Sequence, residues 1–117
     1  MFERIPFLNG DLLVLCKAAD VEEESPLRVE VEGKAPLAVF NLAGQYFVTD
    51  DTCTHGEASL ADGFIEGEEI ECPWHAGRFC IRTGKATAFP AVTPLKVYKT
   101  RLVDGYVAID VSMKGSQ

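Results

Sequence analysis

Two short pairs of cysteine and histidine are the residues of this sequence best suited to chemistry. Cys53 and His55 form a C-x-H pair, Cys72 and His75 form a C-x-x-H pair, and sixteen residues separate the two pairs. Both histidines of the protein and two of its four cysteines lie in this stretch. Because thiolate and imidazole are good metal ligands, the stretch is predicted to hold a metal centre.

The order of these ligands restricts the kind of centre. In a zinc finger a cysteine pair precedes a histidine pair, whereas here each pair contains one residue of each type. Four such ligands could still close on zinc as Cys₂His₂. The same order is expected where two cysteines bind one iron of a cluster and two histidines bind the other.

The segments that must position these pairs have the pattern of short strands. Apolar residues alternate with polar ones, or form short apolar runs, and Gly67 and the Asp104-Gly105 pair mark hairpin turns. No stretch longer than one turn has a helical pattern. Strands are predicted over residues 12–16, 27–32, 37–42, 46–48, 64–65, 69–71, 78–82, 95–102 and 106–111, the first four of them as a meander.

These strands predict an all-β fold, a small antiparallel sandwich or barrel. Residues 1–117 are expected to form a single domain, with a metal-binding β subdomain inserted over about residues 50–90 and a frayed tail over 112–117. Cys16 and Cys80 lie alone in strand-like runs and are predicted to be buried free thiols that pack as small apolar side chains.

The composition points to a soluble protein with protein partners. The N-terminus lacks a basic region followed by a long apolar run, so a cytoplasmic protein without a signal peptide or a membrane span is expected. A net charge of −7 argues against nucleic acid and anionic membranes as partners.

Residues 50–71 contain eight acidic residues and neither lysine nor arginine. This acidic stretch is either a solvated surface that aids solubility or a docking surface for basic partners. Arg78, Arg82 and Lys85 follow it and are expected to be solvated, with pairing to these acids as the alternative. The acids are Asp50, Asp51, Glu57, Asp62, Glu66, Glu68, Glu69 and Glu71.

The segments CTHG and CPWH, at residues 53–56 and 72–75, resemble the ligand motifs of Rieske proteins, with a spacer of similar length. The resemblance implies one [2Fe–2S] cluster, with Cys53 and Cys72 on a buried iron and His55 and His75 on the outer iron. Neutral imidazoles raise the reduction potential above that of all-cysteine clusters. Gly56 and Gly77 are expected to let backbone N–H groups approach the cluster sulfurs.

The chain further resembles Rieske-type ferredoxins of bacterial aromatic-ring-hydroxylating dioxygenase systems, through APLAVFNLAGQYFVTDDTCTHG, EIECPWHAGRFCIRTGKA and the last hairpin. That resemblance implies a one-electron carrier, expected to be monomeric and not itself an enzyme. Its implied partners are a flavin-containing NAD(P)H-dependent reductase and a terminal oxygenase. The alternatives are a redox subunit of another complex, such as a nitrite reductase small subunit, and a structural zinc module.

High-potential Rieske proteins of cytochrome bc complexes differ from this sequence at four positions. They join the two ligand loops by a disulfide, where Glu57 and Trp74 stand here, and they place serine and tyrosine hydroxyls against the cluster, where Gly77 and Phe79 stand here. A potential toward the low end of the Rieske range of roughly −150 to +300 mV is therefore expected.

Two features near the second ligand pair have open roles. Trp74 either caps the cluster against water or belongs to a docking surface. Phe89, Pro90 and Pro94 are expected to be packing residues of a stiff loop, and the resemblance implies that this loop covers one side of the cluster.

Overall fold

The computed structural model describes residues 12–31, 33–54, 58–74 and 76–110. In this part of the chain every sheet is antiparallel and the helical segments are two short 3₁₀ turns, η1 (Ala18–Asp20) and η2 (Leu60–Asp62). No helix among these residues is long and apolar enough to span a membrane. The predicted all-β fold is confirmed.

The first sheet joins the beginning and the end of the chain. Strand β1 (Leu12–Lys17) pairs with β11 (Tyr106–Asp110), which pairs in turn with β10 (Thr100–Val103). Leu12 lies opposite Asp110, and the register shifts between Val14 and Cys16. The predicted meander of the first four strands is wrong at this point, because β1 pairs with the last strand and not with the next one.

The second sheet has the order β2-β3-β4-β9 and packs against the first. Its strands are β2 (Leu27–Val29), β3 (Leu37–Leu42), β4 (Gln45–Asp50) and β9 (Val97–Tyr98). Strand β3 is almost wholly buried, as its continuous apolar run predicts. Val39 and Val48 from this sheet meet Val107 and Ile109 from the first in one core cluster.

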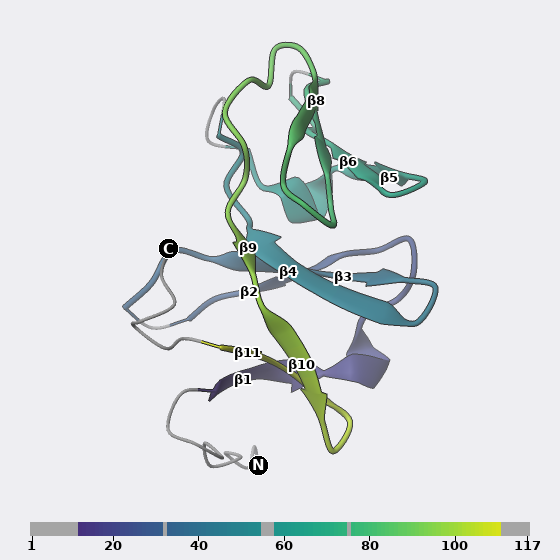
Figure 1. The fold of residues 1–117 in the computed structure, drawn as a ribbon, viewed down its shortest axis with the longest axis vertical. Coiled ribbons are helices and arrows are strands. Elements are labelled where there is room, and N and C mark those ends of the chain that lie inside the picture. Colours follow the sequence, from purple (N-terminus) through teal and green to yellow (C-terminus); the bar gives the residue numbers. More distant parts are fainter. Residues whose placement is uncertain (1–11, 32, 55–57, 75, 111–117) are drawn as a thin grey trace.

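The third sheet is built from the residues between β4 and β9. It has the order β5-β6-β7-β8 and stands at the end of the molecule opposite β1 (Figure 1). Its strands are β5 (Phe64–Glu66), β6 (Glu69–Glu71), β7 (Arg78–Cys80) and β8 (Ala86–Ala88). A second core cluster, which includes Phe40 of β3 and Phe79 of β7, joins this sheet to the second.

Several predicted boundaries need correction. Strand β7 ends at Cys80, where the Gly84 N–H bonds the Cys80 carbonyl at 2.7 Å and closes a turn. The strand predicted over 95–102 is two strands, which belong to different sheets. Cys16 and Cys80 are partly exposed and not buried. The predicted Asp104-Gly105 turn is confirmed by φ values of +49° and +84°, as a type I′ turn requires.

Candidate metal centre

Cys53 lies at the start of the first ligand loop, three residues beyond the end of β4. Its backbone N–H donates to the carbonyl of Ala58 at 3.0 Å, and Thr52 forms an isolated β-bridge with Ser59. These bonds close a narrow loop whose base is fixed on both sides. His55, Gly56 and Glu57 fall inside this loop but outside the described residues.

Cys72 lies at the start of the second ligand loop, directly after β6. Its N–H donates to the Gly77 carbonyl at 2.8 Å, and its own carbonyl accepts from the Ala76 N–H at 3.2 Å. Ala76 has a φ of +63°, in the left-handed region, which turns the chain back into β7. His75 lies within this turn and outside the described residues.

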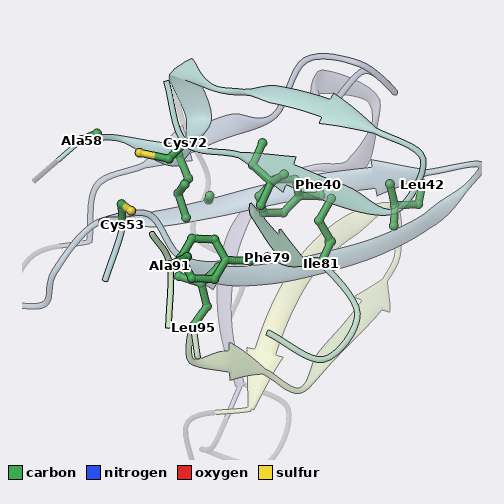
Figure 2. Close-up of a cluster of buried hydrophobic side chains, with 12 residues drawn as sticks. Phe40, Leu42, Cys53, Ala58, Cys72, Phe79, Ile81, Ala91 and Leu95 are labelled. Atoms are coloured by element: carbon green, nitrogen blue, oxygen red, sulfur yellow. The ribbon is translucent and has the colours of Figure 1, made fainter. Parts of the chain in front are cut away.

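The two cysteine side chains are brought together in one apolar environment. Cys53 is 2% exposed and Cys72 is 1% exposed, and both belong to the core cluster that contains Phe79 and Leu95. Figure 2 shows both sulfur atoms at the same end of this cluster, away from Leu42. The loops that carry the predicted ligands therefore place two buried thiols in one core cluster.

Within the described ranges no group of three or more His, Cys, Asp or Glu side chains could hold a metal ion. Both histidines of the sequence lie outside those ranges. Cys16 lies elsewhere, on β1, where burial and the nearby Asp20 raise the pKa of its thiol to about 11. Cys80 lies on β7, where a hydrogen bond from the Thr83 side chain lowers its pKa.

A family model described as the Rieske [2Fe-2S] domain matches residues 11–99. The chain belongs to the Rieske family. The ferredoxin component of the p-cumate 2,3-dioxygenase system of Pseudomonas putida is 46% identical over 102 residues, which cover 86% of each protein. The solved ferredoxin of Sphingomonas yanoikuyae B1 is 49% identical, with a TM-score of 0.82, over 84% of this chain and 96% of that one.

A chain in the complex of reduced oxygenase and oxidized ferredoxin of carbazole 1,9a-dioxygenase is 40% identical. It has a TM-score of 0.81 and is matched over 86% of this chain and 94% of that one. A chain described as a nitrite reductase (NADPH) small subunit is 21% identical with a TM-score of 0.71, a likeness that shows the fold alone.

The residues present fit the [2Fe–2S] cluster that this family carries. Such clusters need cysteine thiolates, and two cysteines lie together at the base of the two loops. The same core cluster contains the apolar side chains of Ile70, Phe79 and Leu95, and it leaves both cysteines almost fully buried. A dry apolar shell of this kind controls solvent access to a metal site.

A segment that follows β8 lies against the second ligand loop of this Rieske domain. We call residues 89–94 the strap. Ala91 within it is buried, and a Cβ atom built on Gly77 would lie only 3.0 Å from the Ala91 Cβ. The closeness of Ala91 explains why glycine stands at position 77, where the carbonyl also accepts a hydrogen bond from the Cys72 N–H. Pro90 follows a cis peptide bond from Phe89.

The loops and the strap also expose large apolar side chains. Trp74 is 64% exposed, Phe89 is 82% exposed and Val92 is 70% exposed. We call these three residues the apolar tip, since the loop after β6 and the segment after β8 lie at the same end of the molecule (Figure 1). The exposure of Phe89 and Pro94 contradicts the packing role expected for them.

The acidic stretch is largely engaged within the molecule. Arg78 contacts Glu66, Glu69 and Glu71 at 3.0, 3.5 and 3.1 Å. Arg82 forms a salt bridge with Glu68 at 2.9 Å. The expectation that these arginines are merely solvated is therefore wrong, and the alternative of pairing with the acids is confirmed. Lys85 is exposed.

The two aspartates at the start of this stretch are also engaged. The Asp50 carboxylate accepts a bond of 2.6 Å from the Tyr98 hydroxyl. Asp51 is 1% exposed and accepts from the Ser59 hydroxyl at 2.6 Å and the Ala61 N–H at 2.9 Å. The count of acids in the sequence includes Asp51 but does not show that it is buried and ties the first ligand loop to η2. In the sequence, the feature that could have indicated this role is the position of Asp51 two residues before Cys53.

Proposed function

We propose that this Rieske protein is the ferredoxin of an aromatic-ring-hydroxylating dioxygenase system. It carries single electrons from a flavin-containing NAD(P)H-dependent reductase to the terminal oxygenase. The observation that carries the proposal is the buried pair Cys53 and Cys72 in a chain that matches the ferredoxin component of a p-cumate 2,3-dioxygenase system over 86% of its length and a solved ferredoxin over 96% of its length. The chain is an electron-transfer component, as those relatives are, and the catalytic site belongs to the oxygenase.

Four residues would hold the cluster. We assign Cys53 and Cys72 to the inner iron, because the two thiols lie in the core, and His55 and His75, the other ligand of each sequence pair, to the outer one. The cluster supplies a reversible one-electron centre when it is bound. Cys53 and Cys72 anchor it to the hydrogen-bonded bases of the two loops, and Phe79 and Leu95 keep water from its inner side.

The surface around the site supports docking through its apolar tip. Trp74, Phe89 and Val92 are exposed. The loop after β6 and the segment after β8, which carry them, lie at the same end of the molecule (Figure 1). Apolar and aromatic side chains contribute most of the binding energy in protein interfaces. A partner that covers these side chains brings its own redox centre close to the cluster. We further propose that the carrier is a cytoplasmic monomer, which can leave one partner for the other.

The first experiment measures the composition of the purified protein. We expect about two irons and two acid-labile sulfides per chain, whereas a structural zinc module would hold one zinc. Replacing His55 or His75 with alanine should remove the visible absorbance of the cluster. A variant that kept its spectrum would exclude that histidine as a ligand.

The second experiment tests the partners by reconstitution. The reduced protein is mixed with a candidate ring-hydroxylating oxygenase, with and without a flavin reductase and NADH, and hydroxylated product is measured. Product that depends on the carrier supports the proposal. Transfer of electrons to a nitrite reductase large subunit, but to none of several ring hydroxylases, would favour the alternative of a redox subunit in another complex.

A further inference from the structure

The strap lies against both ligand loops, although it is far from the first in sequence. The Thr54 hydroxyl, next to Cys53, donates to the Thr93 carbonyl at 2.7 Å across 39 residues of chain. Gly77, at the end of the second loop, approaches Ala91 so closely that a Cβ atom on it would lie 3.1 Å from the Ala91 N. One segment therefore contacts the loops of both cysteines.

Backbone bonds hold the strap at its two ends. The Ala91 N–H donates to the Ala88 carbonyl at 3.0 Å, and the Leu95 N–H donates to the Gly84 carbonyl at 2.7 Å. Between these bonds the chain runs through Val92, Thr93 and Pro94, all of which are exposed. The Thr54 hydroxyl bonds the strap within this exposed part, so its contribution is to hold the middle of the strap against the first loop.

We propose that Thr54 is a positioning residue that acts through the Thr93 carbonyl to hold the strap over the cluster site. Together with the Gly77–Ala91 contact, it joins the two ligand loops without a covalent link. When the Thr54 bond opens, the strap moves away and water or a chelator reaches the cluster more readily.

The test compares three variants of the cluster-loaded protein. Thr54→Val removes the hydroxyl and keeps the shape of the side chain, whereas Thr54→Ser keeps the hydroxyl. Thr100→Val is the matched control. The Thr100 hydroxyl also donates to a backbone carbonyl, that of Tyr98 at 3.0 Å, but Thr100 lies on β10 in the first sheet. The rate of cluster loss to EDTA is followed by visible absorbance, and the midpoint potential and thermal stability are measured beside it.

Loss of one hydrogen bond should increase the population of the open strap, and with it the rate of cluster loss, by about three- to tenfold in Thr54→Val. Thr54→Ser and Thr100→Val should stay within about twofold of the wild type, because neither opens the strap. The midpoint potential should shift in Thr54→Val alone, since the cluster gains contact with water. An unchanged rate in Thr54→Val, or the same acceleration in Thr100→Val, would overturn the proposal.

Gly77→Ala is a second arm that displaces the strap from the other ligand loop. It must also accelerate cluster loss, and a wild-type rate in this variant overturns the proposal even if Thr54→Val fails to fold. None of these measurements needs a reductase or an oxygenase. The inference can therefore fail while the proposed electron-carrier function stands, and the reverse also holds.

Discussion

The Arg78 guanidinium lies 3.0 Å from the Glu66 carboxylate on the third sheet. Glu66 holds the pKa of Arg78 above its ordinary value. The same guanidinium contacts Glu69 and Glu71, so one cation is shared by three carboxylates of the acidic stretch. These carboxylates are less available to a basic partner than the sequence alone predicts.

The salt dependence of electron transfer tests this pairing. The wild type should transfer electrons more slowly as salt rises, but with a shallow slope. Arg78→Gln releases three carboxylates and should steepen that slope, because exposed charges are screened within about 10 Å at 0.1 M salt. Arg101→Gln, at an exposed position on β10, changes the net charge equally without unpairing these acids. Stopped-flow rates with equal slopes in the two variants would contradict the prediction.

Gly77→Ser should destabilise the protein. From the sequence, a serine hydroxyl at this position is expected to raise the midpoint potential, but the new Cβ would lie 3.0 Å from that of the buried Ala91. Overpacking of this kind costs about 1–3 kcal/mol. Chemical denaturation should show this loss, and adding Ala91→Gly should recover most of it and reveal the higher potential. A single variant as stable as the wild type would show that the strap accommodates the side chain.

Phe79→Tyr should raise the midpoint potential. Phe79 is fully buried in the same core cluster as Cys53 and Cys72, and a hydroxyl there can donate to the cluster side of the core. A buried hydroxyl without a partner costs about 1–3 kcal/mol. Redox titration and thermal unfolding should together show a higher potential with little loss of stability. Lower stability at an unchanged potential would mean that the hydroxyl finds no acceptor at the site.

The sequence predicted local structure well and long-range pairing poorly. The apolar run of β3 and the Asp104-Gly105 turn carry their signal in neighbouring residues, and both are confirmed. The pairing of β1 with β11 depends on residues at opposite ends of the chain, which alternation cannot match. Strand β8 was missed because the run Ala86-Thr87-Ala88 is short and its apolar side chains are small, so its alternation does not stand out.

At the candidate site, too, local features could be predicted from the sequence and long-range contacts could not. The spacing of Cys53 and Cys72 predicted a shared centre, and the structure places both thiols in one core cluster. The bond from Thr54 to Thr93 spans 39 residues and has no local signal in the sequence. The exposure of Val92 was also missed, since an apolar side chain is expected in the core unless the fold places it elsewhere.

Cys80 should react with iodoacetamide faster than Cys16 at pH 8. The Thr83 side chain lowers the pKa of Cys80, whereas burial and then Asp20 raise that of Cys16 to about 11. Since thiolate is the reactive form, mass spectrometry should find Cys80 modified first and Cys16 only at higher pH. Cys80→Ser should abolish the early product. Modification of Cys16 first at pH 8 would contradict these environments.

The raised pKa of Cys16 also makes the stability of the folded protein decrease at alkaline pH. The folded state favours the neutral thiol, so this contribution is complete below the ordinary pKa of 9.0 and is lost as pH rises toward about 11. Cys16→Ala should flatten the loss of thermal stability over that window. If the thermal stability of this variant fell with pH as steeply as that of the wild type, other titratable groups would be responsible for the loss.

Phe89→Ser and Val92→Ser should each weaken electron transfer to the oxygenase without unfolding the protein. Both side chains are more than two-thirds exposed, so the folded core does not depend on them. Residues at the centre of an interface cost more than about 1 kcal/mol when truncated, which is a loss of about fivefold or more in kcat/KM for the carrier. Leu102→Ser is the matched control, because Leu102 is 53% exposed on β10 in the first sheet. The control should stay close to the wild type, and an equal loss in all three variants would remove the apolar tip as the docking surface.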